Sequence, residues 1–355
     1  MTIDLGMQLY KRCCCQLLKN IMKLTIVLFS ITIFVFTSCK KENTTPNHEK
    51  FYSLSVDSLK ILQTNIPNDI YNDMAFVSAS TGYAVSSNGR IIKTENGGYN
   101  WTELASNVSF YLKRIQFVNS QTGYVIGGDM ADGYLLKTEN GGSSWQKIKL
   151  DINEPGSPSS MYFLNATTGF ITGKNYFKKT TDGGATWANV MGEVPESFAD
   201  VSFKTNNEGF ATALAGKYYM TINGGVSWQL VQSDISDPLG EISHTASTSY
   251  AISGTNLIDL QTGKNATGLK IPAGIRRLLF LNNKNGIGIG QHYDVGFLPY
   301  GDIHLTNSTW GQSIKKTYSP VSEALDFRAI AKKADGKILI LGQAVLSTPL
   351  VELTY

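Results

Sequence analysis

Charged residues recur along this sequence at similar intervals, each three positions ahead of the anchor residue of a repeated phrase. They are Asp73, Arg114, Asp200, Glu241 and Arg277. Two uncharged residues, Ser160 and Phe327, complete the series. Side chains of both signs at one site can recognise a polar ligand or a peptide through charge-assisted hydrogen bonds. The competing interpretation is that strands of the fold simply begin with solvated residues.

Residues suited to catalysis or metal binding are few. The four histidines form no cluster with metal-ligand spacing, and we expect His304 to pair with Asp302 on one strand. All four cysteines lie within the first 39 residues, which leaves the rest of the chain without a disulfide framework, a structural zinc site or a cysteine nucleophile. We therefore predict no catalytic residue, no metal site and no cofactor. The sequence leaves open whether two carboxylates form a pair for glycoside cleavage, because the distance between them is a three-dimensional property.

The net charge excludes one class of partner. The formal charge of +3 arises entirely from the first 39 residues, so the remaining residues are neutral overall. Because binding to phosphate backbones requires a basic surface, we predict no nucleic acid partner.

The N-terminal region has the pattern of a targeting signal. In MKLTIVLFSITIFVFTSCKKE, residues 22–42, a basic start precedes an apolar run that is too short to span a bilayer. The small residues before Cys39 resemble the lipobox of bacterial lipoproteins. The resemblance implies a signal peptide over 22–38, an acylated Cys39 that binds membrane lipid, and a polar tether over 39–57. Since Lys40 rather than Asp follows Cys39, it also implies an outer-membrane address in the cell envelope. Residues 1–21 precede a complete signal, and we interpret them as the result of an upstream start codon assigned in error. The alternative is a genuine N-terminal extension with palmitoylated Cys13, Cys14 and Cys15.

The elements that position the charged series come from a repeat. KTENGGYNW (93–101) returns as KTENGGSSW, KTTDGGATW and MTINGGVSW, and a Gly-aromatic phrase such as TGYAV precedes each copy. The first four tryptophans, Trp101, Trp145, Trp187 and Trp228, are separated by 44, 42 and 41 residues, and Trp310 lies 82 beyond the last. Repeats of this length with four short strands each indicate a β-propeller.

Counting both phrases predicts an all-β, seven-bladed propeller over residues 58–355. Seven inner-strand phrases are present, but only six outer strands follow them. SLKILQT, residues 58–64, has the spacing of the missing outer strand. We expect it to pair with the last blade and close the ring, which removes an open sheet edge. Because the charged series stands just ahead of the inner-strand phrases, we expect it to line the mouth of the central channel, where the loops between blades converge.

The phrase T-x-[Asn/Asp]-Gly-Gly-x-x-Trp resembles the Asp-box, or BNR repeat, of sialidase-type propellers. With the upstream Gly-Tyr-Ala-Val phrase, the chain is most similar to the photosystem II assembly-factor family. That resemblance implies a structural role for the box, on the side of the ring away from ligands. It does not imply a photosynthetic role here, since nothing in the sequence indicates a photosystem client.

Together these features predict a monomeric, membrane-anchored propeller that acts as a binding or assembly scaffold for an envelope protein, a peptide or another polar ligand. One alternative is a glycan-acting hydrolase of sialidase-like or other glycosidase type. The chain lacks the early Phe/Tyr-Arg-Ile-Pro phrase of sialidases, which argues against a sialidase-like hydrolase. A second alternative is a structural subunit of an envelope complex.

Overall fold

The computed structural model describes residues 58–152, 157–191, 196–283, 285–293, 299–306, 314–318, 325–344 and 347–355. The predictions for residues 1–57, including Cys39, and for Trp310 lie outside these ranges. Within them, no helix has the length and apolar character needed to cross a membrane.

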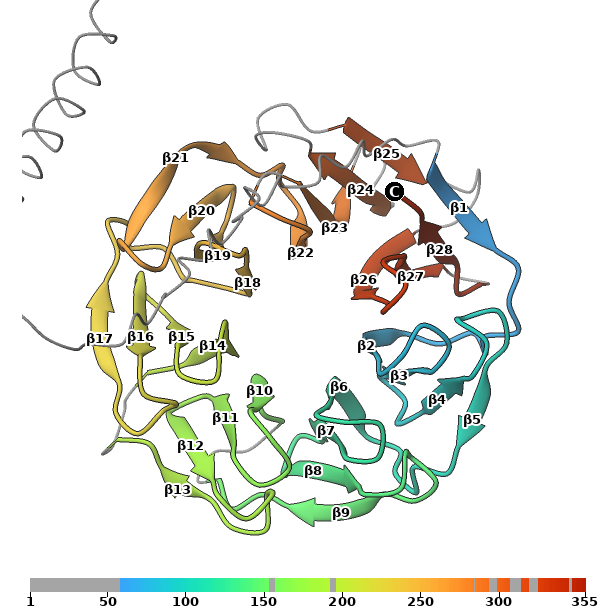
Figure 1. The fold of residues 1–355 in the computed structure, drawn as a ribbon, viewed down its shortest axis with the longest axis horizontal. Helices are drawn as coiled ribbons and strands as arrows, with labels where there is room; N and C mark the ends of the chain where they lie inside the picture. Colours follow the sequence, from blue (N-terminus) through green and yellow to red (C-terminus); the bar gives the residue numbers. More distant parts are fainter. Residues whose placement is uncertain are drawn as a thin grey trace, which may run out of the picture. The chain divides into compact units, whose positions relative to one another are not determined.

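The described residues form seven four-stranded antiparallel sheets arranged as blades around a ring (Figure 1). Blades 1 to 3 comprise β2 (Tyr71–Phe76), β3 (Gly82–Ser86), β4 (Ile91–Thr94), β5 (Thr102–Leu104); β6 (Tyr111–Phe117), β7 (Gly123–Gly128), β8 (Gly133–Thr138), β9 (Gln146–Lys149); and β10 (Ser160–Phe163), β11 (Gly169–Gly173), β12 (Tyr176–Thr180), β13 (Ala188–Asn189). Blade 4 comprises β14 (Phe198–Phe203), β15 (Gly209–Ala213), β16 (Lys217–Thr221) and β17 (Gln229–Gln232). The first strand of each blade is innermost.

Blades 5 and 6 continue the same order. They comprise β18 (Ile242–His244), β19 (Ser249–Ser253), β20 (Asn256–Asp259), β21 (Lys264–Lys270); and β22 (Ile275–Phe280), β23 (Gly286–Tyr293), β24 (Pro299–Thr306), β25 (Ile314–Tyr318). Blade 7 is built from both ends of the ring: β26 (Leu325–Lys332), β27 (Ile338–Ala344), β28 (Leu350–Leu353) and β1 (Leu59–Leu62).

The N-terminal strand closes the ring as predicted. β1 pairs with β28 from Leu59 opposite Leu353 to Leu62 opposite Leu350. This pairing gives β28 a neighbour on each side, so β28 is not left as an edge strand where the two ends of the ring meet, and β1 forms the outer edge of the blade.

The two ends of the ring differ in their turns. One end, the box face, carries the Asn/Asp-Gly-Gly turns and the turns between the first and second strands of each blade. The two kinds of turn are hydrogen-bonded, as where the Gly97 amide donates to the Ser80 carbonyl at 2.8 Å. The other end, the loop face, carries the connections between blades. Because Leu59 lies opposite Leu353, which in turn lies opposite Ile338, β1 begins at the box face.

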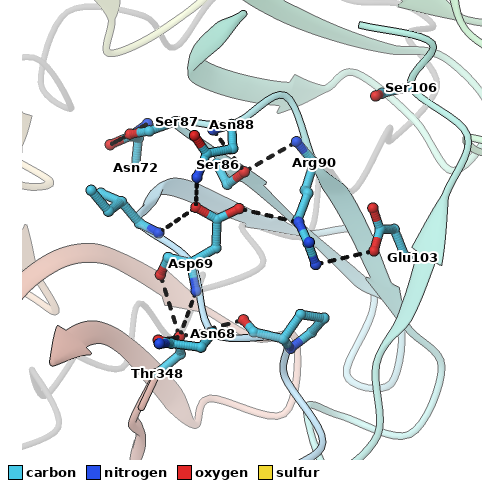
Figure 2. A network of polar contacts seen from close by, with 12 residues as sticks. Asn68, Asp69, Asn72, Ser86, Ser87, Asn88, Arg90, Glu103, Ser106 and Thr348 are labelled. Carbon is cyan, nitrogen blue, oxygen red and sulfur yellow. Dashed lines mark hydrogen bonds and ion pairs between the residues drawn. The ribbon is translucent and has the colours of Figure 1, made fainter. Parts of the chain in front are cut away.

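A polar network fixes the seam between blades 7 and 1 at the loop face (Figure 2). The Asp69 amide donates to the Thr348 hydroxyl at 3.1 Å, joining the segment before β2 to the turn between β27 and β28. The buried Asp69 carboxylate accepts a hydrogen bond from Asn88 at 2.7 Å and lies 3.3 Å from the Arg90 guanidinium. Arg90 also reaches Glu103 at 3.3 Å. These partners offset the desolvation of the Asp69 charge, so the network holds the seam.

The hydrophobic core is divided among the gaps between blades. Each of seven apolar clusters is built mainly from the facing sides of two neighbouring blades, including the gap across the closure. The ring therefore stays together through inter-blade packing, and each blade is stable only against its neighbours.

The Gly-aromatic phrase has a packing reason. A Cβ on Gly123 would lie 2.6 Å from the ring of Phe117, which ends the inner strand of the same blade, so only glycine fits beneath that ring. The aromatic residue of the phrase then stacks on the next blade, as Tyr83 does on Phe117 with ring centroids 4.2 Å apart. Trp145 meets the same Phe117 edge-on at 6.1 Å. One phenylalanine thus joins the glycine, the neighbouring blade and the box tryptophan.

The box turns act structurally, as the resemblance implies. In the third copy the Thr180 hydroxyl accepts from the Gly184 amide at 2.9 Å and donates to Asp182 at 2.8 Å. Asp182 accepts from the Thr186 amide at 2.9 Å. Gly184 has a φ of +93°, which glycine tolerates without steric cost. The other three copies repeat the threonine and asparagine bonds.

Candidate functional site

The predicted charged residues lie on the innermost strands next to β-bulges, and Glu241 lies one residue before β18. The register with the second strand shifts just before Asp73, Arg114, Asp200 and Arg277. A bulge re-aims the side chains around it, here toward the central channel. We expected the series to lie where the loops between blades converge. The inner strands instead begin earlier than the sequence suggested, which places these residues inside the channel wall.

The seventh member of the series requires a correction. In blade 7 the shift lies between Phe327 and Ala329, and Lys332 opposite Ile338 ends the inner strand. The counterpart of Asp73 is therefore Ala329, and Phe327 corresponds to the apolar residue that precedes each bulge. Phe327 is fully buried in the core between blades. The third member, Ser160, is buried and donates a hydrogen bond to Asp200 at 2.5 Å.

All five charged residues join in one chain of alternating sign. Arg277 lies 2.9 Å from Asp73 and 3.7 Å from Glu241. Arg114 lies 3.6 Å from Glu241 and 3.7 Å from Asp200. The order is thus Asp73, Arg277, Glu241, Arg114, Asp200, and each arginine stands between two carboxylates. The strands therefore bring together every residue of the predicted site.

The two aspartates at the ends of this chain have a structural task. An innermost strand is a sheet edge, so some of its amides face the channel without a strand partner. Asp73 accepts from the Ile115 amide at 3.0 Å, and Asp200 accepts from the Ile242 amide at 2.8 Å. In both cases the carboxylate of one blade bonds the inner strand of the next. Asp73 and Asp200 therefore join neighbouring blades along the channel wall.

Arg114 and Glu241 are bonded differently. Both side chains are largely buried, with 19% and 17% exposure. Among the described residues, neither the Arg114 guanidinium nor the Glu241 carboxylate makes a hydrogen bond, since their ion-pair distances exceed 3.5 Å. Arg277, by contrast, donates to Asp73 at 2.9 Å and to the Asn72 carbonyl at 3.0 Å. Arg114 and Glu241 therefore keep unused donors and acceptors.

These two side chains line a cavity of about 220 Å³ at the channel wall. The other polar side chains that line it are already paired. Gln116 bonds both the amide and the carbonyl of Phe163, at 2.8 and 2.9 Å, and Tyr162 donates to the Phe203 carbonyl at 3.2 Å. Ser202 bonds His244 at 2.8 Å. The free hydrogen-bonding capacity of the cavity is therefore concentrated at Arg114 and Glu241.

Burial and neighbouring charges shift the pKa values of this group. Burial raises the pKa of Glu241, and Arg277 and Arg114 partly oppose that shift. For Arg114 burial acts to lower the pKa, but Glu241, Asp200 and Asp73 together raise it. The attraction between the opposite charges thus offsets part of the free-energy cost of burying each group.

Sequence reasoning missed the bulge residues themselves. Burial and the adjacent Arg114 lower the pKa of Lys113 to about 8, and Lys113 has no hydrogen bond or ion pair within the described part of the chain. In blades 6 and 7, Arg276 and Arg328 share Asp326, at 3.2 and 2.7 Å. These basic residues stand one position from the predicted series or its corrected counterpart. A bulge places two consecutive residues opposite one, so a search of the flanking positions would have found them.

The remaining chemical candidates have ordinary roles. His244 bonds Ser202 and Ser249, each at 2.8 Å, and burial lowers its pKa to about 4. His304 and Asp302 lie 3.8 Å apart on β24 and are both buried, as expected of a strand pair. No group of three metal-ligating side chains occurs in the described ranges. The channel wall carries mixed charge, and hydrogen bonds from backbone amides occupy two of its carboxylates, Asp73 and Asp200.

Solved structures share this architecture. YCF48 bound to D1 peptide matches with a TM-score of 0.66 and 19% identity, covering 85% of this chain and 98% of that one. YCF48 from Cyanidioschyzon merolae matches with a TM-score of 0.63 and 16% identity, covering 83% and 98%. A streptogramin B lyase matches with a TM-score of 0.61 and 13% identity, covering 83% and 97%. At these identities the similarity shows the fold alone.

Comparison with protein families is more specific. No curated protein matches the chain. The family described as photosynthesis system II assembly factor YCF48 matches residues 53–250, more than half of the chain, including all four regular box repeats. The chain therefore belongs to the photosynthesis system II assembly factor YCF48 family.

Proposed function

We propose that this protein is a membrane-anchored scaffold that binds a polypeptide segment at the charged wall of its channel. The observation that carries the proposal is the pair Arg114 and Glu241, which lines a cavity and keeps its hydrogen-bonding groups unused. A polypeptide offers donors and acceptors along its whole length, so it suits a wall with both. A YCF48 has been solved with a D1 peptide bound, which supports a peptide as the ligand class.

The scaffold suits recognition because little of it needs to move. The inner strands are held to their neighbours by Asp73 and Asp200, and the blades by stacked aromatic residues. A site on such strands is formed before the ligand arrives, so less entropy is lost on binding.

The binding half of the proposal is tested by capture from the native membranes. Proteins crosslinked to the wild-type chain are identified by mass spectrometry, and overlapping peptides of each are titrated against the purified propeller. We expect one peptide to bind the Arg114→Gln variant at least about tenfold more weakly than wild type, because truncation of a charged contact typically weakens binding by this much. Lys264→Ala is the matched control, because it removes one exposed positive charge remote from the cavity. Equal affinity in wild type and Arg114→Gln would overturn the site.

The anchoring half has a separate test. The lipobox-like residues before Cys39 support acylation, and several acyl chains give stable membrane attachment where one does not. Cells expressing wild type or Cys39→Ser are labelled with a palmitate analogue and fractionated. The proposal expects label and outer-membrane recovery for wild type, and neither for Cys39→Ser. Label that persists in Cys39→Ser would refute acylation at this residue.

A further inference from the structure

The pairing pattern in the cavity selects for a particular chemical group. On the basis of the proposed function, we propose that Arg114 and Glu241 form a subsite for the side-chain carboxamide of an asparagine or glutamine in the bound polypeptide. The group's oxygen accepts from the Arg114 guanidinium, and its NH₂ donates to the Glu241 carboxylate.

The geometry leaves room for such a bridge. Arg114 and Glu241 are 3.6 Å apart at their nearest atoms, beyond the usual ~2.7–2.9 Å of a charge-assisted hydrogen bond. The two side chains attract one another, but their pairing leaves hydrogen-bond donors on Arg114 and acceptors on Glu241 unused. A carboxamide carries an acceptor and two donors on one small planar group, so it can bond both at once.

The charges on either side argue against an ionic ligand group. An anion bound to Arg114 would lie beside Glu241 and Asp200, the two carboxylates that already flank this arginine. A cation bound to Glu241 would lie beside Arg114 and Arg277. Each would meet two like charges in a largely desolvated place, where such repulsion is strongest. A neutral group with both polarities meets neither repulsion, and its own desolvation costs far less than that of an ion.

The remaining wall suits the rest of such a side chain. Ile115, Met161, Val201 and Ile242 contribute apolar surface to the same cavity. Its volume of about 220 Å³ far exceeds the ~10–15 Å³ that one water needs, so a side chain can enter. The methylene groups of asparagine or glutamine would contact this apolar part while the carboxamide reaches the charged pair.

The test is a selection from a displayed library of random twelve-residue peptides on the immobilised, purified propeller. Selections are run in parallel on wild type, Glu241→Gln, Arg114→Gln and the control Lys264→Ala. For wild type and the control, we expect asparagine or glutamine to be enriched at least threefold over both acidic and basic residues at one aligned position. Glu241→Gln should shift that position to aspartate or glutamate. Arg114→Gln should shift it to lysine or arginine.

Several outcomes separate this inference from the proposed function. A charged residue selected by wild type at that position, or variants that leave the preference unchanged, would overturn the carboxamide subsite while leaving peptide binding intact. A library from which wild type enriches nothing would overturn peptide binding itself. Should Arg114→Gln fail to fold, Arg114→Lys keeps the charge but loses the planar donor pair, and the asparagine or glutamine preference should fall.

Discussion

Three glycine-to-alanine substitutions can separate the two costs of adding a methyl group in this ring. At Gly254 φ is +58° and nothing lies within 4 Å of an added Cβ, so only backbone strain is felt. At Gly209 φ is outside the left-handed region, but an added Cβ lies 2.5 Å from the Phe203 ring. At Gly225, the second glycine of the fourth box, φ is +72° and the Cβ lies 2.2 Å from the Phe170 ring of the preceding blade.

The magnitudes follow from these two terms. Left-handed strain costs about 1–2 kcal/mol, so Gly254→Ala should lose about that much unfolding free energy. Overpacking costs about 1–3 kcal/mol, which is the loss expected for Gly209→Ala. Gly225→Ala carries both costs and should lose about 2–5 kcal/mol.

The assay is urea unfolding followed by tryptophan fluorescence. Trp228 is a suitable reporter, because its ring lies 5.7 Å from Phe170. If Gly225→Ala proves no more costly than Gly254→Ala, the second box glycine does not pack against the neighbouring blade, and our account of the repeated phrase is wrong.

Three further predictions concern titration and closure. The pKa of His244 is about 4 in the folded chain against 6.5 when unfolded, so its contribution is complete above pH 6.5 and is lost as pH falls toward 4. The wild type should lose about 3 kcal/mol across that window in unfolding experiments, beyond what His244→Asn loses. Lys113, with a folded pKa of about 8 against 10.5, destabilises the fold below pH 8, and that penalty disappears as pH rises from 8 to 10.5. Lys113→Met should therefore melt at a higher temperature than wild type at pH 7, and this difference should shrink at pH 10.5. Deleting residues 1–64 removes β1 and exposes the edge of β28, so light scattering should detect oligomers, whereas deletion of residues 1–57 should leave a monomer.

The repeat made most of the fold predictable. Counting the inner-strand phrases together with the outer strands was sufficient for the number of blades, because each copy of a phrase marks the same position in a successive sheet. The closing strand was found by its distance from Phe76, which equals the distance from Trp101 to Phe117. Local hydrogen bonds of threonine, asparagine and glycine are short-range, so a single phrase specifies them.

The site was predictable in membership but not in arrangement. Spacing identified Asp73, Arg114, Asp200, Glu241 and Arg277, and the fold brings all five together. Spacing did not reveal which arginine donates a hydrogen bond to Asp73, because that depends on distances across the channel. The anchor of the seventh repeat was misplaced by two residues, since blade 7 has Lys332 where other blades have an aromatic residue or histidine. No local pattern marks that position, and only the strand register shows it.

The place where β1 enters the ring has a practical consequence. β1 is an outermost strand and starts at the box face, whereas the bulges with Arg114 lie in the half of the inner strands nearer the loop face. Anything joined ahead of residue 58, whether a lipid, a bead or a fluorescent label, is therefore attached at the rim of the opposite side.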